Sequence, residues 1–275
     1  MTEFTLHEIV PGVQYASGGV CNRGIIADQG DVLVIDTGIS VAEGTALREA
    51  ADKLHTHGSL IAFNTHPHLD HVFGNEVFRD SAIIAHEGVR ENLVTTGAQT
   101  LAGLSKNPQM AERIGPIQLT PPTVTFDNTL TIHVGAIEVH FLYFGIAHSP
   151  SDSVAWLPQS RTLFTGDLLF NALVPATPPG GSINNWIQAL EKLEQLGAEH
   201  VISGHGPSEP PTALGNMRTW FELLRTRVNG AIKDGLDRDA TIARVTAEMQ
   251  AASPRASQER YPMVIGGAFD QYSQA

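Results

Sequence analysis

The stretch Thr65-His66-Pro67-His68-Leu69-Asp70-His71 places three imidazoles and one carboxylate within six residues. In an extended or turning segment, side chains two residues apart point the same way. His66 and His68 can therefore face one point in space, while Asp70 and His71 face a neighbouring point. Neutral imidazole is the commonest metal ligand in proteins, and a carboxylate beside it supplies negative charge for a divalent cation. This spacing favours two adjacent metal ions over the alternative, a polar loop that is merely rich in histidine.

The apolar run Leu60–Asn64 predicts a buried strand that ends directly before this motif. A short helix is expected to follow the motif through about Val77. The motif thus lies between a strand and a helix, on a loop held by a rigid scaffold. Functional residues commonly occupy such loops, so we interpret the motif as part of a functional site.

Three later segments each place a candidate ligand just after a predicted buried strand. His148 lies in a turn, Asp167 follows a glycine, and His205 lies between two glycines. Glycine lets the backbone approach its neighbours closely and adopt positive φ. With the first motif, the set comprises five histidines and two aspartates. That number suffices for two zinc ions, each with about four or five ligands, plus a shared water.

The other seven histidines have no partners in register, and we interpret them as surface or packed residues. They are His7, His55, His57, His86, His133, His140 and His200. His86 follows a predicted strand as the candidate ligands do, so its position in the fold is a check on this interpretation.

The rest of the chain alternates between strand and helix patterns. Apolar and alternating runs predict strands at residues 4–9, 14–17, 24–27, 32–35, 60–64, 82–85, 129–134, 137–141, 153–157, 162–165 and 200–203. Capping residues and apolar spacing predict helices at 40–57, 87–96, 219–233 and 241–250, and one that starts after Ser182. Each half of the chain, before and after about Pro122, contains strands followed by helices. This predicts an α/β protein with two face-to-face sheets and helices outside, an αββα four-layer sandwich.

Two segments depart from this pattern. Residues 100–122 show weak periodicity and several Gly and Pro positions. Loops of this length are often lids or binding loops, and a mobile connector is the alternative. Residues 208–275 are expected to form a helical C-terminal extension, although the last twenty or so residues show no clear pattern. Residues 1–275 are predicted to form a single domain.

The composition limits the partners and the compartment. A hydrophobic content of 42% is enough for a sizeable core, and the formal net charge is −12. Such an acidic surface repels nucleic-acid phosphates and anionic lipids, so we expect neither nucleic-acid nor membrane partners. The one cysteine, Cys21, cannot form an internal disulfide and is predicted to be a small buried hydrophobe. The first ten residues lack a signal-peptide pattern, and no run approaches the ~20 apolar residues of a membrane span. A cytoplasmic location is therefore expected.

The combined pattern resembles the metallo-β-lactamase superfamily, and within it the glyoxalase II-like dinuclear metallohydrolases. The resemblance is carried by His-x-His-x-Asp-His, a later lone His, an Asp after a strand and Gly, and a Gly-His near the end. It covers about residues 4–207 and implies the αββα fold. It also implies one metal bound by His66, His68 and His148, a second bound by Asp70, His71 and His205, and a bridge formed by Asp167.

Two zinc ions about 3.5–4 Å apart can hold one hydroxide between them, and zinc lowers the pKa of its bound water to about 7. Iron and manganese are alternatives to zinc. Asp70 is the candidate catalytic residue, because it lies near this nucleophile and can orient the water and shuttle its proton. The chemistry suits hydrolysis of a thioester, an ester or a lactone.

Residues 85–97, 121–126 and 130–135 further resemble the metallo-β-lactamase-fold thioesterase/cyclases of aromatic polyketide biosynthesis. This likeness implies a small-molecule or carrier-bound acyl substrate of secondary metabolism. Phe73, Phe170 and Asn171 lie beside the ligands in the sequence and are candidates for substrate contacts. Ordinary packing is the alternative role for these three residues.

Three other functions remain open: a β-lactam or other amide hydrolase, an iron-dependent sulfur dioxygenase, and a non-catalytic metal-binding module. The β-lactamases of the superfamily are exported and usually lack a carboxylate bridge, whereas Asp167 is present here. The dioxygenase needs a single redox metal, which disagrees with the full ligand set. Structural zinc sites are usually rich in cysteine. The sequence also leaves open whether the protein forms a homo-oligomer.

Overall fold

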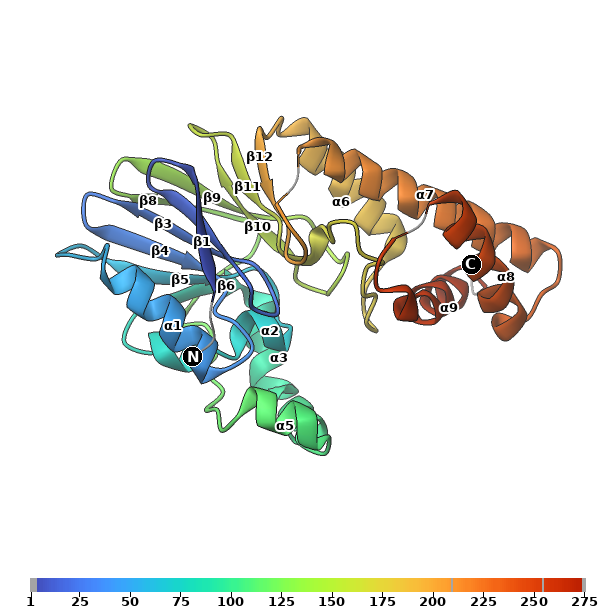
Figure 1. The fold of residues 1–275 in the computed structure, drawn as a ribbon, viewed down its shortest axis with the longest axis horizontal. Helices are drawn as coiled ribbons and strands as arrows, with labels where there is room; N and C mark the ends of the chain where they lie inside the picture. The colour runs from blue at the N-terminus through green and yellow to red at the C-terminus, as the bar shows by residue number, and fades with distance from the viewer. Residues whose placement is uncertain (1–3, 209, 254, 274–275) are drawn as a thin grey trace.

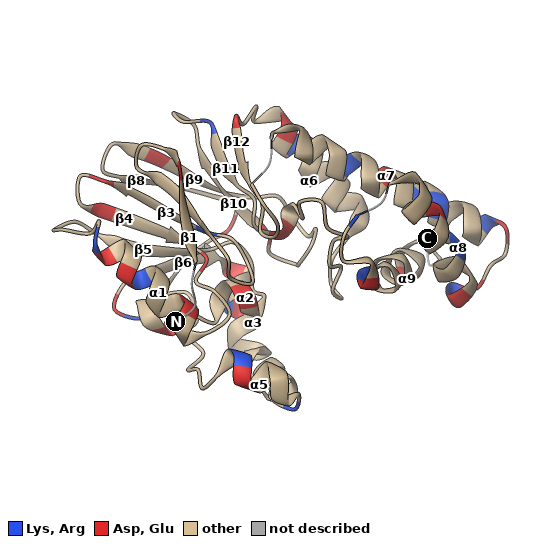
Figure 2. Ribbon diagram, in the orientation of Figure 1, with Lys and Arg blue, Asp and Glu red and all other residues tan. Residues whose placement is uncertain are grey.

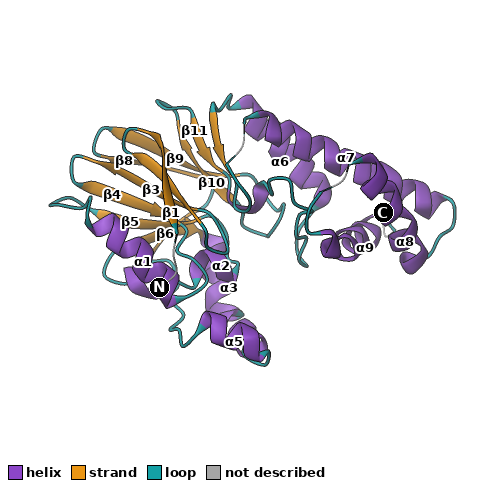
Figure 3. Cartoon of the chain, viewed as in Figure 1, coloured by secondary structure: helices purple, strands orange, loops and turns teal. Residues whose placement is uncertain are grey.

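The structure is a computed structural model, and it describes residues 4–208, 210–253 and 255–273. Two β-sheets pack face to face, and helices cover their outer faces (Figures 1 and 3). The predicted αββα sandwich is therefore confirmed.

The strands are β1 (Thr5–Val10), β2 (Val13–Ser17), β3 (Arg23–Asp28), β4 (Asp31–Ile35), β5 (Leu60–Asn64), β6 (Ala82–His86), β7 (Val124–Phe126), β8 (Thr129–Val134), β9 (Ile137–Tyr143), β10 (Ser153–Leu157), β11 (Thr162–Phe164) and β12 (His200–Ile202). The α-helices are α1 (Val41–Asp52), α2 (Leu69–Val72), α3 (Glu87–Thr95), α4 (Gly97–Leu104), α5 (Pro108–Ile114), α6 (Ile183–Gln195), α7 (Thr212–Lys233), α8 (Arg238–Ala252) and α9 (Tyr261–Tyr272). The 3-10 helices are η1 (Asn75–Phe78), η2 (Gly166–Leu168) and η3 (Gln258–Arg260).

In the described residues, seven strands form the first sheet in the order β1-β2-β3-β4-β5-β6-β7. Strands β4 to β7 run parallel, and parallel strands are usually buried on both faces. Alternate side chains of β4 show why: Leu33 and Ile35 face the second sheet, whereas Val32 and Val34 pack on the side of α1. The carboxyl ends of the parallel strands lie at one edge of the sheet, and the His-rich motif follows β5 at that edge.

The second sheet has the order β12-β11-β10-β9-β8 in the described chain, and β11 and β12 run parallel. The core between the sheets contains Phe63 of β5 and Phe141 of β9, whose rings stack with their centroids 4.0 Å apart. Both side chains are fully buried. This aromatic contact connects the strand that precedes the His-rich motif to the opposite sheet.

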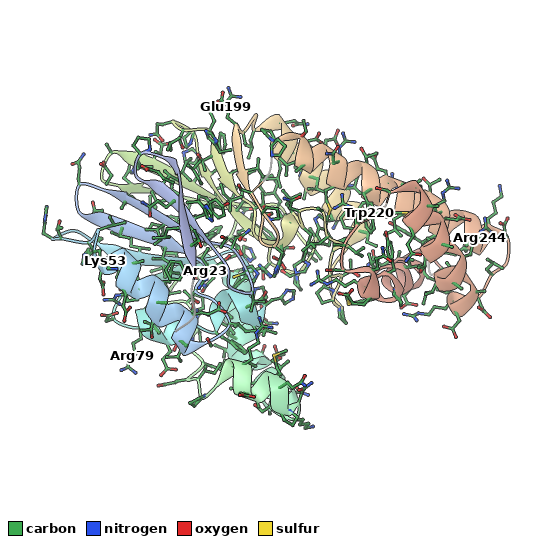
Figure 4. All side chains as sticks on the ribbon, in the orientation of Figure 1. Arg23, Lys53, Arg79, Glu199, Trp220 and Arg244 are labelled. Atoms are coloured by element: carbon green, nitrogen blue, oxygen red, sulfur yellow. The ribbon has the colours of Figure 1, made fainter. Side chains whose placement is uncertain are left out.

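Helix α6 covers the outer face of the second sheet, and α7, α8 and α9 extend from it (Figure 1). Trp186 of α6, Trp220 of α7 and Val264 of α9 belong to one continuous buried cluster. Figure 4 labels Trp220 on the stretch of α7 near α9. The C-terminal helices therefore share their core with the helix that covers the sandwich.

Helices α1 and α6 begin where their capping residues predict, but the end of α1 and the bounds of other helices differ. The Ser40 and Ser182 hydroxyls accept hydrogen bonds from the backbones of Glu43 and Asn185, so both predicted caps are present. Helix α1 ends at Asp52 rather than near residue 57, because the exposed residues that follow tighten into a turn. Helix α7 begins seven residues earlier than predicted, directly after the proline pair 210–211.

Residues 100–122 were expected to be a loop, and this expectation is wrong for about half of the segment. Helices α4 and α5 form a helical hairpin whose apolar side chains Leu101, Leu104 and Met110 pack against α3. Each helix has only about two turns, which is too short to produce a clear period in the sequence. Asn107 caps α5 ahead of Pro108, a start signal that the analysis of periodicity missed.

Helix α9 was not predicted either. Its sequence contains the pair Gly266-Gly267, which lowers helix propensity. The helix forms because Tyr261, Val264 and Ile265 are buried against α7 and α8. Tertiary packing thus outweighs a weak local preference.

The surface carries both signs of charge. Lys and Arg residues are distributed over the helices and interleaved with Asp and Glu (Figure 2). Among the described helices, none combines the length and the apolar composition that crossing a bilayer requires. A cytoplasmic location and the lid role of residues 100–122 remain predictions, as does the single-domain assignment.

The stacked pair between the sheets generates a prediction of stability. We expect Phe63→Ala to lower the free energy of unfolding by about 3–5 kcal/mol, because it leaves a cavity in the layer that both sheets share. Leu6→Ala, at a position 40% exposed on β1, is the matched control and should change stability by less than about 1 kcal/mol. Chemical denaturation measures both, and equal effects of the two variants would contradict the assigned role of the Phe63–Phe141 contact.

Candidate metal centre

The seven candidate ligands all follow strands, and the two sheets bring them together. His66, His68, Asp70 and His71 come after β5, and α2 begins within this motif. The other three follow strands of the second sheet: His148 lies between β9 and β10, Asp167 in η2 after β11, and His205 after β12. Strand ends from both sheets therefore meet at one edge of the sandwich.

The first group of ligand atoms surrounds one carboxylate oxygen. His148 Nε2 lies 2.8 Å from His68 Nδ1, and Asp167 Oδ2 lies 3.3 Å from His148 Nε2 and 3.7 Å from His66 Nε2. His68 therefore offers its Nδ1 atom, whereas His66 and His148 offer Nε2. These four residues place one ligand atom each within 4.8 Å of the others.

The second group contains Asp70, His71 and His205. Asp70 Oδ2 lies 3.3 Å from His205 Nε2 and 3.6 Å from His71 Nε2. The other oxygen of Asp167, Oδ1, lies 3.2 Å from the Nε2 atoms of both His71 and His205. Asp167 thus presents one carboxylate oxygen to each group, and the two groups fit a dinuclear metal site.

A glycine makes the position of Asp167 possible. A Cβ atom on Gly204, next to His205, would lie 2.1 Å from Asp167 Oδ1. Any other residue would displace this carboxylate or the strand end that carries His205. The glycine flanking His205 therefore serves the close approach that the sequence indicated.

The hydrogen-bonding state of the buried ligand atoms tests whether metal ions fit. His66 Nε2, His71 Nε2 and Asp167 Oδ1 are buried and have no hydrogen-bond partner among the described residues. Buried polar atoms without a partner are rare, because each loses its hydration without compensation. Divalent cations would satisfy all three atoms at once, so the residues present fit the metals that the sequence implied.

The Nδ1 atoms of His71 and His148, which face away from the ligand groups, are within hydrogen-bonding distance of oxygen atoms. Asp36 Oδ2 lies 2.7 Å from His71 Nδ1, and Asp36 also accepts hydrogen bonds from the backbone and hydroxyl of Thr65. His148 Nδ1 lies 3.0 Å from the carbonyl oxygen of Ala176. These contacts hold the proton on Nδ1, leave the Nε2 lone pair for a metal, and fix the orientation of each ring. Asp36 was not among the predicted site residues, although its place directly after the buried strand β4 matches that of the ligands.

Burial and neighbouring charges divide the histidines into two states. Burial, with a smaller contribution from His148, lowers the pKa of His68 to about 3, and burial likewise lowers the pKa of His66. Burial would also lower the pKa of His205, but the carboxylates of Asp167 and Asp70 raise it to about 10. In the metal-free protein, His66 and His68 are therefore neutral, whereas His205 is protonated.

A buried carboxylate outside the ligand set shapes the turn that carries His148. Asp152 accepts hydrogen bonds from the backbone N–H and the hydroxyl of Ser149, both at 2.7 Å. Burial raises the pKa of Asp152 to about 6 despite these donors. Sequence analysis missed this residue, because a single Asp four positions after a ligand has no distinctive spacing.

The three predicted substrate contacts, Phe73, Phe170 and Asn171, are all buried, with exposed fractions of 4%, 1% and 3%. Phe73 packs in the cluster beneath α2. The Phe170 ring stacks on His205 with 5.1 Å between centroids, and the Asn171 backbone N–H donates to the carbonyl of His205. Phe170 and Asn171 thus contact the ligand His205, and a direct contact with substrate remains a prediction for all three residues.

Phe170 and Asn171 also line a cavity of about 520 Å³ together with Asn216 and Trp220 of α7. None of the seven candidate ligands lines this cavity. The cavity is therefore separate from the metal centre in the described structure, and the Phe170 ring lies between it and His205.

Two residues that the sequence analysis weighed have structural roles here. His86 Nδ1 accepts a hydrogen bond from the backbone of Gly88 at the start of α3, and its ring stacks on Tyr143. Cys21 is buried and donates its S–H to the carbonyl of Asp70. Burial raises the pKa of the Cys21 thiol, so it stays protonated.

Comparison with known proteins agrees with this geometry. Residues 16–205 match the sequence profile of the metallo-beta-lactamase superfamily, which confirms the predicted resemblance. The structure is similar to that of the stereoselective inverting sec-alkylsulfatase Pisa1 from Pseudomonas sp., with 17% identity and a TM-score of 0.72 over 98% of this chain and 50% of that chain. The chain thus spans about half the length of the alkylsulfatase.

Two metallo-beta-lactamase structures are also similar. The DIM-1 metallo-beta-lactamase has 19% identity and a TM-score of 0.62 over 80% of this chain and 97% of its own. The metallo-beta-lactamase from Pontibacter korlensis has 19% identity and a TM-score of 0.63. The match covers 80% of this chain and 99% of that chain. At these identities the similarity shows a shared fold.

The position of Asp167 predicts its effect on metal content. We expect Asp167→Ala to lower the metal bound per chain from two ions to one or fewer, because both groups lose a shared carboxylate. Asp127→Ala, at an exposed position, is the control and should bind two. Elemental analysis after dialysis measures this. Two tightly held ions in Asp167→Ala would show that the bridge is dispensable.

Asp152 predicts a dependence of stability on pH in the metal-free protein. Its pKa is higher in the folded chain than in the unfolded chain, so the folded state binds the extra proton between pH 4 and 6. Through this residue, the free energy of unfolding should fall by about 3 kcal/mol as the pH rises across that range. Urea denaturation of the wild type and Asp152→Asn from pH 4 to 6 measures the difference. Parallel curves for the two proteins would contradict the assignment.

Proposed function

The chain belongs to the metallo-beta-lactamase superfamily, and on this premise we propose that it is a hydrolase that uses two zinc ions to cleave a thioester, an ester or a lactone. One observation carries the proposal. The two oxygens of Asp167 face different ligand groups, and buried ligand atoms in both groups have no hydrogen-bond partner in the described part of the chain. The donor set is composed of imidazole and carboxylate without thiolate, which is typical of catalytic rather than structural zinc.

When bound, the two ions would lower the pKa of a water molecule toward ~7 and polarise the carbonyl group under attack. Asp70 has the most exposed side chain of the three carboxylates at the centre, at 14% against 4% for Asp167 and 2% for Asp36. Its Oδ2 atom faces His71 and His205. Its exposure and its position support the proposed role of Asp70, which is to orient the attacking water and accept its proton.

The character of the leaving group favours a thioester. Thiols have a pKa near ~8.5, so a thiolate leaves without a strong acid to protonate it. The proton that Asp70 accepts is sufficient for the product thiol. An amine leaving group, as in an amide, would need a committed proton donor at the scissile nitrogen.

An apolar surface next to the ligands supports an acyl substrate. Val20 and Leu69 are partly buried and pack on the same cluster as Leu101, Leu104 and Met110 of the α4–α5 hairpin. The Val20 carbonyl oxygen lies 2.9 Å from His205 Nδ1, and Leu69 directly precedes Asp70. The cluster therefore extends from the helical hairpin to the metal ligands, where a hydrocarbon chain would lose water-exposed area on binding. An acyl chain held on a carrier, as in polyketide thioesterase/cyclases, fits this arrangement.

A sulfate ester is the second candidate substrate. The alkylsulfatase matches 98% of the chain, whereas the β-lactamases match 80%. The part of this chain that the β-lactamases do not match therefore has a structural counterpart in the sec-alkylsulfatase. An alkyl sulfate also carries a hydrocarbon chain, so the apolar cluster suits both candidates.

Turnover separates these candidates. We expect zinc-loaded protein to release thiol from acyl thioesters. The rate should be higher for an acyl chain of eight carbons than for an acetyl group, and removal of zinc by a chelator should lower the rate at least 100-fold. Asp70→Asn, checked for retained zinc, should lower kcat by 100-fold or more. The substrates are an acyl thioester series, matched oxygen esters, a lactone, a chromogenic β-lactam and a secondary alkyl sulfate.

The other outcomes assign other functions. Release of sulfate alone would favour the second candidate, and opening of the β-lactam alone would favour an amide hydrolase. Sulfur oxidation by protein that holds one iron would favour the dioxygenase. Two bound zinc ions with no turnover of any class would favour a binding module and overturn the proposal.

A further inference from the structure

The loop that joins β2 to β3, residues 18–22, crosses behind the second group of ligands. It comes from the N-terminal end of the chain, yet it contacts the segment that follows β12, more than 180 positions away. We call residues 18–22 the β2–β3 loop. Three of its residues, Val20, Cys21 and Asn22, form hydrogen bonds with candidate metal ligands or with the backbone next to them.

Asn22 makes the most contacts of this kind. Its backbone N–H donates to the carbonyl oxygen of Gly204 at 2.8 Å. Its side-chain Nδ2 donates to the carbonyl oxygens of Ser203 at 2.8 Å and Gly206 at 2.6 Å. These three carbonyls lie on both sides of His205. One asparagine side chain and its own backbone therefore fix the turn that presents the His205 imidazole.

The neighbours of Asn22 contact the ligands themselves. The Val20 carbonyl oxygen lies 2.9 Å from His205 Nδ1, which holds the proton there and leaves Nε2 for a metal. Cys21 Sγ donates to the Asp70 carbonyl oxygen at 2.9 Å. The β2–β3 loop thus holds Asp70 and His205, two ligands of the same group that come from opposite halves of the chain.

A buried ion pair fixes the loop in turn. Arg23 Nη1 lies 3.5 Å from Glu43 Oε2, and the exposed fractions of the two side chains are 1% and 5%. Figure 4 labels Arg23 between the first sheet and the helices below it. A Cβ on Gly19 would lie 2.6 Å from Arg23 Nη2, so only glycine lets the loop lie directly on this pair. The loop is therefore held on one side by the Arg23–Glu43 pair at α1 and on the other by hydrogen bonds to the segment after β12.

The first group of ligands is supported from elsewhere. His148 is held by the Ala176 carbonyl and by the Ser149–Asp152 turn. Among the hydrogen bonds of the described residues, none joins residues 18–22 to His66, His68 or His148. The β2–β3 loop thus supports ligands of the second position directly, and a change in this loop should affect that position more than the first.

We propose that Asn22 is a positioning residue that sets the affinity of the second metal position, made of Asp70, His71 and His205, through the turn that carries His205. This inference rests on the proposed dinuclear site. Asn22 touches neither the substrate nor a metal in this assignment. It keeps His205 at the distance from Asp70 and Asp167 at which one ion can contact all of them.

The test compares stepwise zinc affinities in the full chain. Asn22→Ala removes the side-chain donor, and Asn22→Asp keeps the shape but turns an acceptor toward two carbonyl oxygens. Asn128→Ala is the matched control, because Asn128 is exposed and its Nδ2 bonds only to the adjacent Asp127 among the described contacts. Competition against a chromophoric chelator gives the two zinc affinities, and circular dichroism of the metal-free proteins verifies that each variant is folded.

We expect both Asn22 variants to bind the second zinc 10- to 100-fold more weakly and the first zinc within about threefold of wild type. Any metal-dependent activity should return at saturating zinc, with the half-saturating zinc concentration raised by the same factor. If Asn22→Ala does not fold, Asn22→Asp and its two affinities decide the question. Equal loss at both positions, or no loss at either, overturns the proposal.

The outcome is separable from that of the proposed function. A wild-type chain that binds fewer than two zinc ions refutes the dinuclear site before any variant is compared. A wild-type chain that binds two ions but hydrolyses no substrate refutes the hydrolase and leaves the affinity comparison valid.

Discussion

The position of one carboxylate, Asp167, constrains the rest of the structure. It is 4% exposed, and its two oxygens face different groups of imidazoles and carboxylates. So many buried polar groups would be unfavourable without a compensating charge, because each has lost its hydration. Burial would raise the pKa of Asp167, but His205 and His71 lower it well below its ordinary range. The centre is thus arranged around a negative charge that divalent cations would balance.

The sandwich explains how such a centre can be held without disulfides or a dedicated loop scaffold. The ligands come from the ends of β5, β9, β11 and β12, and their relative positions follow from the packing of the two sheets. Phe63 and Phe141 stack across that packing, so the strand before the His-rich motif is fixed relative to the strand before His148. Three acceptors, the Asp36 carboxylate and the Ala176 and Val20 carbonyl oxygens, then hold the proton on Nδ1 and leave Nε2 free for a metal. The histidines held in this way are His71, His148 and His205. Strand packing gives the position of a ligand, and a polar contact gives its orientation.

Most of the sandwich could be predicted from the sequence, because its strands are continuous apolar runs with clear turns between them. The ligands could be predicted because His66 to His71 are close in sequence and the other three each follow a strand. Their supports could not. Asn22 bonds to the segment around His205, more than 180 positions away, and no sequence pattern indicates this contact. Asp36 can be recognised as a support only once the structure shows that β4 lies beside β5. Short helices such as α4 and α9 depend on tertiary burial, which leaves no period in the sequence.

Substrate choice must then reside in what surrounds the centre. The fold is shared with β-lactamases and an alkylsulfatase at 17–19% identity, so the fold alone selects no substrate. What differs between such proteins is the loops and helices near the ligands. In this chain the α4–α5 hairpin brings Leu101 and Met110 into the same apolar cluster as Val20 and Leu69, which adjoin the ligands. An apolar surface beside a centre that binds polar atoms suits a molecule with a reactive carbonyl or ester at one end and a hydrocarbon chain at the other. The leaving group, and not the hydrocarbon chain, then distinguishes the candidate substrates, because a thiolate needs little acid assistance to leave.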